Sequence, residues 1–146
     1  MKPAEILLFD YLTERIAAAA FGDTLFELEL HDTVWQTIQT NRGIRISDAV
    51  SVLVPDSQGG MKEWDASLII TCYARVEGVD VKSRQPAVQA VFDIEQAVCD
   101  ALYANGGSLG GRVCALTINP ATRGYDNLDS KAYATVNIPI VINPSQ

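Results

Sequence analysis

The segment WDASLIITCYARV at residues 64–76 constrains the fold more than any other stretch, because apolar and polar residues alternate along it. Successive side chains of a β-strand point to opposite faces, so this alternation predicts a long strand in a half-covered sheet. The residues predicted to face the core are Trp64, Ala66, Leu68, Ile70, Cys72, Ala74 and Val76. The predicted polar face carries Asp65, Ser67, Thr71, Tyr73 and Arg75, with only Ile69 out of type.

Two amphipathic helices are predicted from apolar residues that recur three or four positions apart. The first runs from Pro3 to about Ala20, with an apolar stripe of Leu8, Leu12, Ile16 and Ala19. The second occupies residues 82–107, with Pro86 in its first turn and the pair Asn105-Gly106 at its end. Its predicted buried stripe is Ala87, Val91, Ile94, Val98, Ala101 and Leu102, which Gln89, Asp93, Glu95, Gln96 and Asp100 avoid.

The other segments favour strands and connections. Strands are predicted at residues 46–55, 112–121 and 131–142, a polar loop at 56–63, and a turn or extended loop at 122–130. In the first of these strands, the apolar residues at even positions are Ile46, Val50, Val52 and Val54, which a regular strand would place on one face. Residues 24–30 favour a strand with a hairpin partner at 33–40, although a helix between 24 and 44 stays open. We therefore expect a single α+β domain over residues 1–146, a mostly antiparallel β-sheet with two amphipathic helices packed on one face.

The last predicted strand contains a proline in the middle of its alternation. Pro139 falls on the outward parity, so the apolar stripe of this strand is undisturbed, but the backbone loses one hydrogen-bond donor. Such a loss is tolerated best at the edge of a sheet. We therefore predict that this strand is an edge, or bulges at Pro139 and leaves the sheet there. Tyr133, Thr135 and Asn137 would then be free for a neighbouring protein.

Composition excludes several classes of function. The net charge is −7, and the basic residues are scattered, which argues against a protein that grips nucleic-acid phosphates. No apolar run reaches membrane-spanning length, and charged residues interrupt the N-terminal apolar stretch, so neither a membrane protein nor an export signal is expected. The three cysteines, Cys72, Cys99 and Cys114, lack the spacing of a zinc site or a disulfide framework. We expect all three in or near the core, in a reducing compartment.

No catalytic, cofactor-binding or metal-binding residue is predicted. His31 adjoins Asp32, but neighbours in a strand point apart, and no nucleophile motif accompanies them. The acidic set Asp23, Glu27, Glu29 and Asp32 lacks the spacing of a known cation loop and reads as a solvated face. The glycine-rich stretch at 105–111 follows a helix C-terminus, where the dipole repels phosphate, so it reads as a flexible connector.

A group of aromatic and basic residues is the best candidate interaction surface. Its members are Tyr73, Arg75, Tyr125 and Tyr133, to which Thr135 and Asn137 of the last strand are added. Such a surface suits single-stranded nucleic acid, ordinary cross-strand pairing or a protein contact. The acidic balance of the chain ranks a protein contact above nucleic acid.

The arrangement of elements resembles the tail terminator proteins of long-tailed bacteriophages and their prophage relatives. The resemblance lies in the helix ILLFDYLTERIAAA, the strand AVSVLVP, the long strand WDASLIITCYARV, the helix AVQAVFDIEQAVCDAL and the C-terminal segment VCALTINPATRGYDNLDSKAYATVNIPIVI. It covers most of the chain and leaves residues 24–44 poorly matched.

The resemblance implies a non-enzymatic virion protein of the tail or neck, made in the host cytoplasm, that forms a homo-hexameric ring. Its expected partners are the tail tube protein and a head-completion protein, with DNA only as passing cargo and no membrane. The loops at 55–63 and 120–130 would reach the tube or the neighbouring subunit. A head–tail connector or head-closure protein is the alternative within the same class. A small α+β ligand-binding or enzymatic domain and a nucleic-acid-binding module are alternatives of other classes.

Overall fold

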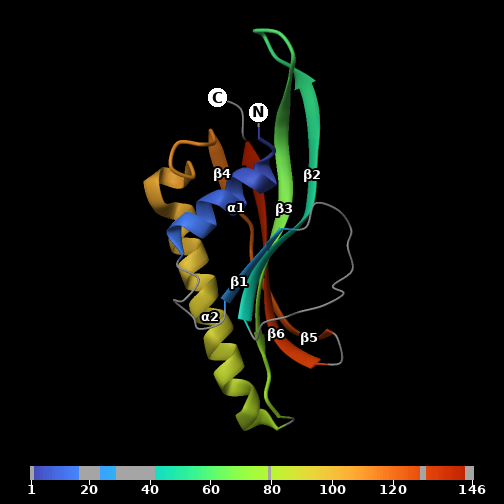
Figure 1. Ribbon diagram of the computed structural model, residues 1–146, viewed down its shortest axis with the longest axis vertical. Helices are drawn as coiled ribbons and strands as arrows, with labels where there is room; N and C mark the ends of the chain where they lie inside the picture. The colour runs from blue at the N-terminus through green and yellow to red at the C-terminus, as the bar shows by residue number, and fades with distance from the viewer. Residues whose placement is uncertain (1, 17–23, 29–41, 79, 129–130, 144–146) are drawn as a thin grey trace.

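The computed structural model describes residues 2–16, 24–28, 42–78, 80–128 and 131–143. Within these residues, two helices, a short 3-10 helix and six strands follow one another (Figure 1). The helical elements are α1 (Ala4–Arg15), α2 (Val81–Tyr103) and η2 (Ala104–Gly107). The strands are β1 (Thr24–Leu28), β2 (Arg42–Pro55), β3 (Met61–Arg75), β4 (Ala115–Ile118), β5 (Thr122–Leu128) and β6 (Lys131–Asn143).

The strands form one sheet in the order β1-β2-β3-β6-β4, and β5 pairs with β6 on the same side as β4. All pairs are antiparallel except β1–β2, which is parallel. Both helices cover one face of this sheet, here called the helix face (Figure 1). The predicted α+β class, a mostly antiparallel sheet with two helices on one face, is confirmed. The strand expected at 24–30 is present as β1, and its expected hairpin partner lies outside the described residues.

The core lies between the helix face and the two helices. Even-numbered residues of the central strands supply it, because every second residue of a strand points the same way. The even-numbered strand residues buried on the helix face are Ile44, Ile46, Ala66, Leu68, Ile70, Cys72, Ala74, Ala134, Val136, Ile138, Ile140 and Ile142. The predicted stripe of α2 is buried in full against them. The alternation in the sequence therefore predicts the middle of the sheet correctly.

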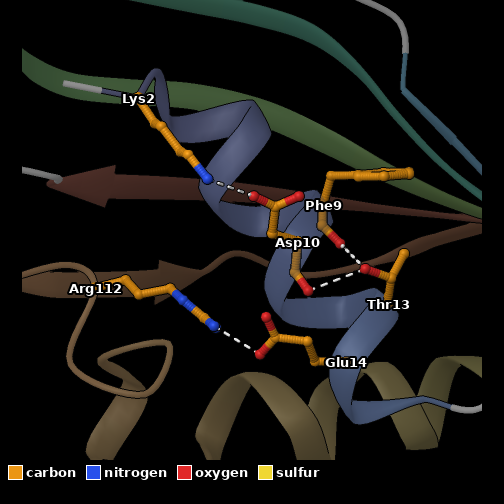
Figure 2. Close-up of polar contacts among 6 residues, drawn as sticks. All are labelled: Lys2, Phe9, Asp10, Thr13, Glu14 and Arg112. Atoms are coloured by element: carbon orange, nitrogen blue, oxygen red, sulfur yellow. Dashed lines mark hydrogen bonds and ion pairs between the residues drawn. The ribbon is translucent and has the colours of Figure 1, made fainter.

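Helix α1 is tied to the C-terminal end of α2 and to the turn that follows it. The Tyr11 hydroxyl donates to the Ala101 carbonyl at 2.6 Å, and Arg112 pairs with Glu14 at 2.6 Å. Figure 2 shows the Arg112 pair beside Lys2–Asp10 and the Thr13 hydroxyl, which donates to the carbonyls of Phe9 and Asp10. The helix ends at Arg15, earlier than predicted, because Ile16 adopts an extended conformation. Residues 17–20 lie outside the described residues.

Strand β6 is central, so the predicted edge position of the last strand is wrong. It pairs with β3 from Tyr133 to Ile142 and with β4 and β5 along its other side. The Pro139 carbonyl accepts the Asn119 N–H at 2.9 Å, so the missing N–H of Pro139 points to that same side. There β4 ends at Ile118 and β5 begins at Thr122. The lost donor therefore falls at the break between two partner strands, where no ladder bond is needed.

Two β-bulges reverse the alternation in β2 and β3. Between Ser47 and Val50 strand β2 has one extra residue, and between Val50 and Val52 the extra residue lies on β3. Asp65, at the second bulge, has a left-handed φ of 45°. After the bulges Val50 lies opposite Ser67 and Val52 opposite Trp64, on the far face of the sheet. Trp64 is therefore not in the core beside Ala66, and the shared parity of 46–54 does not mark one face.

Four further expectations are corrected. Helix α2 begins at Val81, behind the cap Asp80, so Pro86 lies in its second turn. Glu95 is buried because Arg123 of β5 reaches over to it at 3.0 Å. Residues 122–128 form strand β5 and not a loop. The glycine-rich stretch packs against the core through Leu109, which has no exposed surface, so it is an ordered turn and not a loose connector.

A close approach at Gly43 yields a stability prediction. A Cβ built on Gly43 overlaps the hydroxyl and ring of Tyr73, whose side chain is fully buried and has no room to move. Gly43→Ala should destabilise the fold by roughly 2 kcal/mol through overpacking. The matched control is Gly124→Ala, whose Cβ comes within 4.0 Å only of Thr135 Oγ1 and should cost less than about 0.5 kcal/mol. Urea denaturation of both variants measures the difference, and equal stabilities would contradict the packing.

The buried Glu63 yields a pH prediction. Desolvation raises the pKa of Glu63 above its ordinary value of 4.5, the Ala4 N–H donor opposes this, and the charge of Glu5 adds to it. The native state then holds the proton more tightly than the unfolded chain. Stability from Glu63 is present below about pH 4.5 and is lost as the pH rises through the higher native pKa.

Glu63→Gln should therefore raise the melting temperature at pH 7 by a few degrees, because the amide oxygen still accepts from Ala4 without carrying a charge. The gain should shrink toward pH 4, where Glu63 itself is neutral. Exposed Glu77→Gln is the control and should leave the melting temperature unchanged. A lower melting temperature of Glu63→Gln at pH 7 would show that the charged form is the favoured one.

Candidate functional site

The predicted interface residues occupy two different faces of the sheet. Tyr73, Tyr133 and Thr135 lie on the far face but are buried, so their expected exposure is wrong. The two tyrosine rings meet edge to face, 5.7 Å apart. Arg75, beside them, is exposed, and Asn137 is half-buried and accepts the Thr71 hydroxyl at 2.7 Å. These five residues are adjacent, as predicted, but they form a packed layer and not an open platform.

Tyr125 is separated from the other predicted interface residues. It lies opposite Ala134 in the β5–β6 ladder and therefore points to the helix face. There its exposed ring contacts the guanidinium of Arg84 from α2, with 5.3 Å between the charge and the ring centre. An aromatic–basic surface that joins Tyr125 to Tyr73 and Tyr133 is therefore not formed within one chain.

Among the described residues, half of the ten exposed large apolar side chains lie on the hairpin of β2 and β3, which projects beyond the helices (Figure 1). We call residues Val50–Asp65 the arm. Its exposed apolar residues, with their exposed fractions, are Val50 at 68%, Val52 at 61%, Leu53 at 58%, Met61 at 54% and Trp64 at 40%. Lys62 lies over the Trp64 ring at 5.4 Å. Clustered exposure of this kind marks contact sites in soluble proteins.

The arm has little support from the rest of the described chain. β1 pairs with β2 only at 42–46, and β6 pairs with β3 only from Ala66 onward, so among the described strands the arm strands pair only with each other. The tip is closed by the Asp56 N–H, which donates to the Gly60 carbonyl at 3.0 Å, with left-handed glycines at 59 and 60. At the base, Glu63 accepts the Ala4 N–H. A two-stranded ribbon with apolar side chains is marginal in water and gains from a partner.

A second candidate surface is a groove between α2 and β5, here called the α2–β5 groove. One hollow of about 360 Å³ lies between Val88, Val91 and Phe92 of α2 and the 123–125 segment of β5. A second hollow, about 450 Å³, continues it toward Val81 and Arg84. Val81, Val88, Phe92 and Tyr125 are all exposed along this groove. It is an apolar trough with a polar rim.

Two arginines form that rim. Arg123 lies over the Phe92 ring at 5.3 Å and donates to Glu95 at 3.0 Å, while Arg84 lies over Tyr125. Cation–π contacts place both guanidinium groups beside the rings, and Glu95 offsets the charge of Arg123. The groove therefore offers an apolar floor, with the Arg84 guanidinium and the Arg123–Glu95 ion pair at its rim.

The candidate catalytic and metal-binding residues considered from the sequence are not brought together in the described part of the chain. His31, Asp32, Asp23 and Glu29 lie outside the described residues, and of Glu27 only its place in β1 is given. Within residues 2–16, 24–28, 42–78, 80–128 and 131–143 no three side chains of His, Cys, Asp or Glu gather as a metal site would require. The groove and the arm are therefore the surfaces on which a functional argument rests.

No known protein-family model matches this chain, and no curated protein matches it significantly. Among the described helices, none is both long enough and apolar enough to cross a membrane.

Sequence reasoning missed both surfaces for identifiable reasons. The sequence pattern assigns part of the arm to a strand with a buried face and part to a polar loop, because the alternation of residue types does not reveal the two bulges. The groove depends on β5, which the residues TRGYDNL do not mark as a strand. One signal was available: Val50, Val52, Leu53 and Val54 are apolar on both parities, which a half-covered strand does not need.

The three cysteines differ in accessibility, which labelling can test. Burial, followed by the charges of Glu95 and of the Cys99 thiol, raises the pKa of the Cys72 thiol. Desolvation, with Glu95 and Asp100, raises the pKa of the half-buried Cys99 thiol. Cys114 is exposed just before β4, which corrects its predicted core position.

At pH 7.5–8, roughly the range where thiol reagents act on ordinary cysteines, Cys114 should react fast and Cys72 only as fast as the protein unfolds. Mass spectrometry after brief alkylation of the native protein measures both rates. Cys114→Ser should remove the fast phase and leave the slow ones unchanged. Fast modification of Cys72 in the native protein would contradict its buried position.

Proposed function

We propose that this protein is a ring-forming, non-enzymatic structural protein of a phage particle, a tail terminator that caps the tail tube and presents the surface to which the head attaches. The observation that carries the proposal is the arm, a projecting hairpin with five exposed large apolar residues. A ring subunit buries such a surface against its neighbours.

Charge supports the same proposal. The chain carries a net charge of −7, and a ring through which DNA passes gains from not binding the phosphates. The arrangement of two helices on one face of a mostly antiparallel sheet agrees with the resemblance drawn from the sequence. The candidate contact surfaces lie on the arm and in the α2–β5 groove, and the originally predicted set around Tyr73 serves as internal packing.

Native mass spectrometry and negative-stain electron microscopy of the purified protein test ring formation. We expect closed rings with a central opening, hexameric if the resemblance extends to subunit number. An antibody against the protein, applied to particles released by the source cells, tests its position and should label the junction of head and tail. A strict monomer at high concentration, together with no label on particles, would overturn the proposal.

A further inference from the structure

We propose that the arm of one copy docks into the α2–β5 groove of a second copy, so that copies join head to tail. This inference rests on the ring-forming function proposed above and assigns the two surfaces that make the ring. Figure 1 shows the arm at one end of the long axis, and the N-terminal half of α2 with β5 at the other end. An arm therefore cannot reach the groove of its own chain, and only another copy can bring the two together.

The two surfaces match in length. The five steps from Val50 to Pro55 span about 17 Å as a strand, at roughly 3.3 Å per residue. The helix from Val81 to Phe92, which forms one wall of the groove, spans about 17 Å at roughly 1.5 Å per residue. The arm can therefore lie along the groove with Val52 and Trp64 over the apolar floor.

The two surfaces are also complementary in charge. Of the described residues that line the two hollows, those with a charge are Arg84 and Arg123, both positive. The arm carries Asp56 and the exposed Asp65 near its apolar residues, while its Lys62 lies over Trp64. In the docked arrangement that we propose, the arm carboxylates would meet the Arg84 guanidinium on the rim, since Glu95 already offsets the charge of Arg123.

Charge also disfavours the symmetric alternatives. Two arms placed side by side bring Asp56 and Asp65 of one copy toward those of the other. Two grooves placed face to face bring arginines together. Like charges at a contact lower affinity and select against the wrong pairing. An arm in a groove avoids both penalties.

The test uses two variants that each disable one surface. Val52→Lys adds a positive charge to the arm, and Val88→Glu adds a negative charge to the groove floor, so each creates a like-charge contact with an intact partner. Both positions are exposed in one chain, so both variants should fold with unchanged melting temperature. Each alone should lower the association constant measured by native mass spectrometry or analytical ultracentrifugation by at least about tenfold.

Mixing the two variants separates head-to-tail docking from its alternatives. The Val88→Glu chain keeps an intact arm and the Val52→Lys chain keeps an intact groove, so the mixture should associate where neither variant does alone. The two altered surfaces carry opposite charges and attract each other, so alternating copies should continue to add. Pairing of arm with arm would instead leave Val88→Glu able to self-associate, and pairing of groove with groove would leave Val52→Lys able to do so. Either result overturns the proposal.

The matched control is Tyr103→Lys, a charge placed on an exposed large apolar residue outside both surfaces. It should associate as the unmodified protein does. A covalent check uses Val52→Cys and Val88→Cys in separate chains, each with Cys114→Ser, and a short bis-maleimide. The mixture should yield cross-linked dimers, whereas no cross-link in a mixture that forms rings would overturn arm-to-groove docking.

The outcomes distinguish this inference from the proposed function. Rings that survive both Val52→Lys and Val88→Glu would overturn the docking and leave the ring proposal standing. Open filaments of the unmodified protein, with association restored in the mixture, would support the docking and overturn the closed ring. No self-association of the unmodified protein at any concentration tested would overturn both.

Discussion

The described fold depends on the two-sided pairing of β6, the strand on which three others converge. β3 pairs with one edge of β6, and β4 and β5 share the other, while its even residues complete the core under α2. A strand with partners on both sides needs its donors, yet Pro139 lacks one. Strands β4 and β5 leave a gap opposite Pro139, so no partner strand requires the missing N–H there. The break between β4 and β5 thus coincides with the missing N–H, and beyond it β5 pairs with β6 and forms one wall of the groove.

The parts of the fold that were predictable are those in which a simple period runs undisturbed. The stripe of α2 and the even residues from Ala66 to Ala74 and from Ala134 to Ile142 are buried as their periods require. Prediction failed where a bulge reverses which residues of a strand face the core, and where a residue distant in sequence determines the burial of a side chain. The bulge at Asp65 moves Trp64 to the other face, and Arg123 keeps Glu95 on the buried side. Neither cause is visible within the local sequence.

The candidate site was the harder part to predict, because parity tells which residues share a face and not whether that face is open. Tyr73 and Tyr133 do share the far face, but Tyr73 lies across Gly43 and against the Tyr133 ring, so both are packed. The exposed surfaces arise instead from length and register. β2 and β3 continue past the strands beside them, and the bulges turn Val50, Val52 and Trp64 away from the helices. The arm is thus a product of sheet geometry, which composition alone does not encode.

Two apolar surfaces at opposite ends of one chain have a consequence for assembly. A contact between unlike surfaces repeats from copy to copy, and the rotation between successive copies decides whether the chain of copies closes into a ring or continues as a filament. That rotation is set where the arm leaves the sheet, because the arm direction fixes how a docked neighbour is oriented. The bulges between Ser47 and Val52 lie at this point, and bulges bend and twist the strands that contain them. In the head-to-tail assembly that we propose, the same two irregularities that expose the apolar residues of the arm would also set the angle between neighbouring subunits.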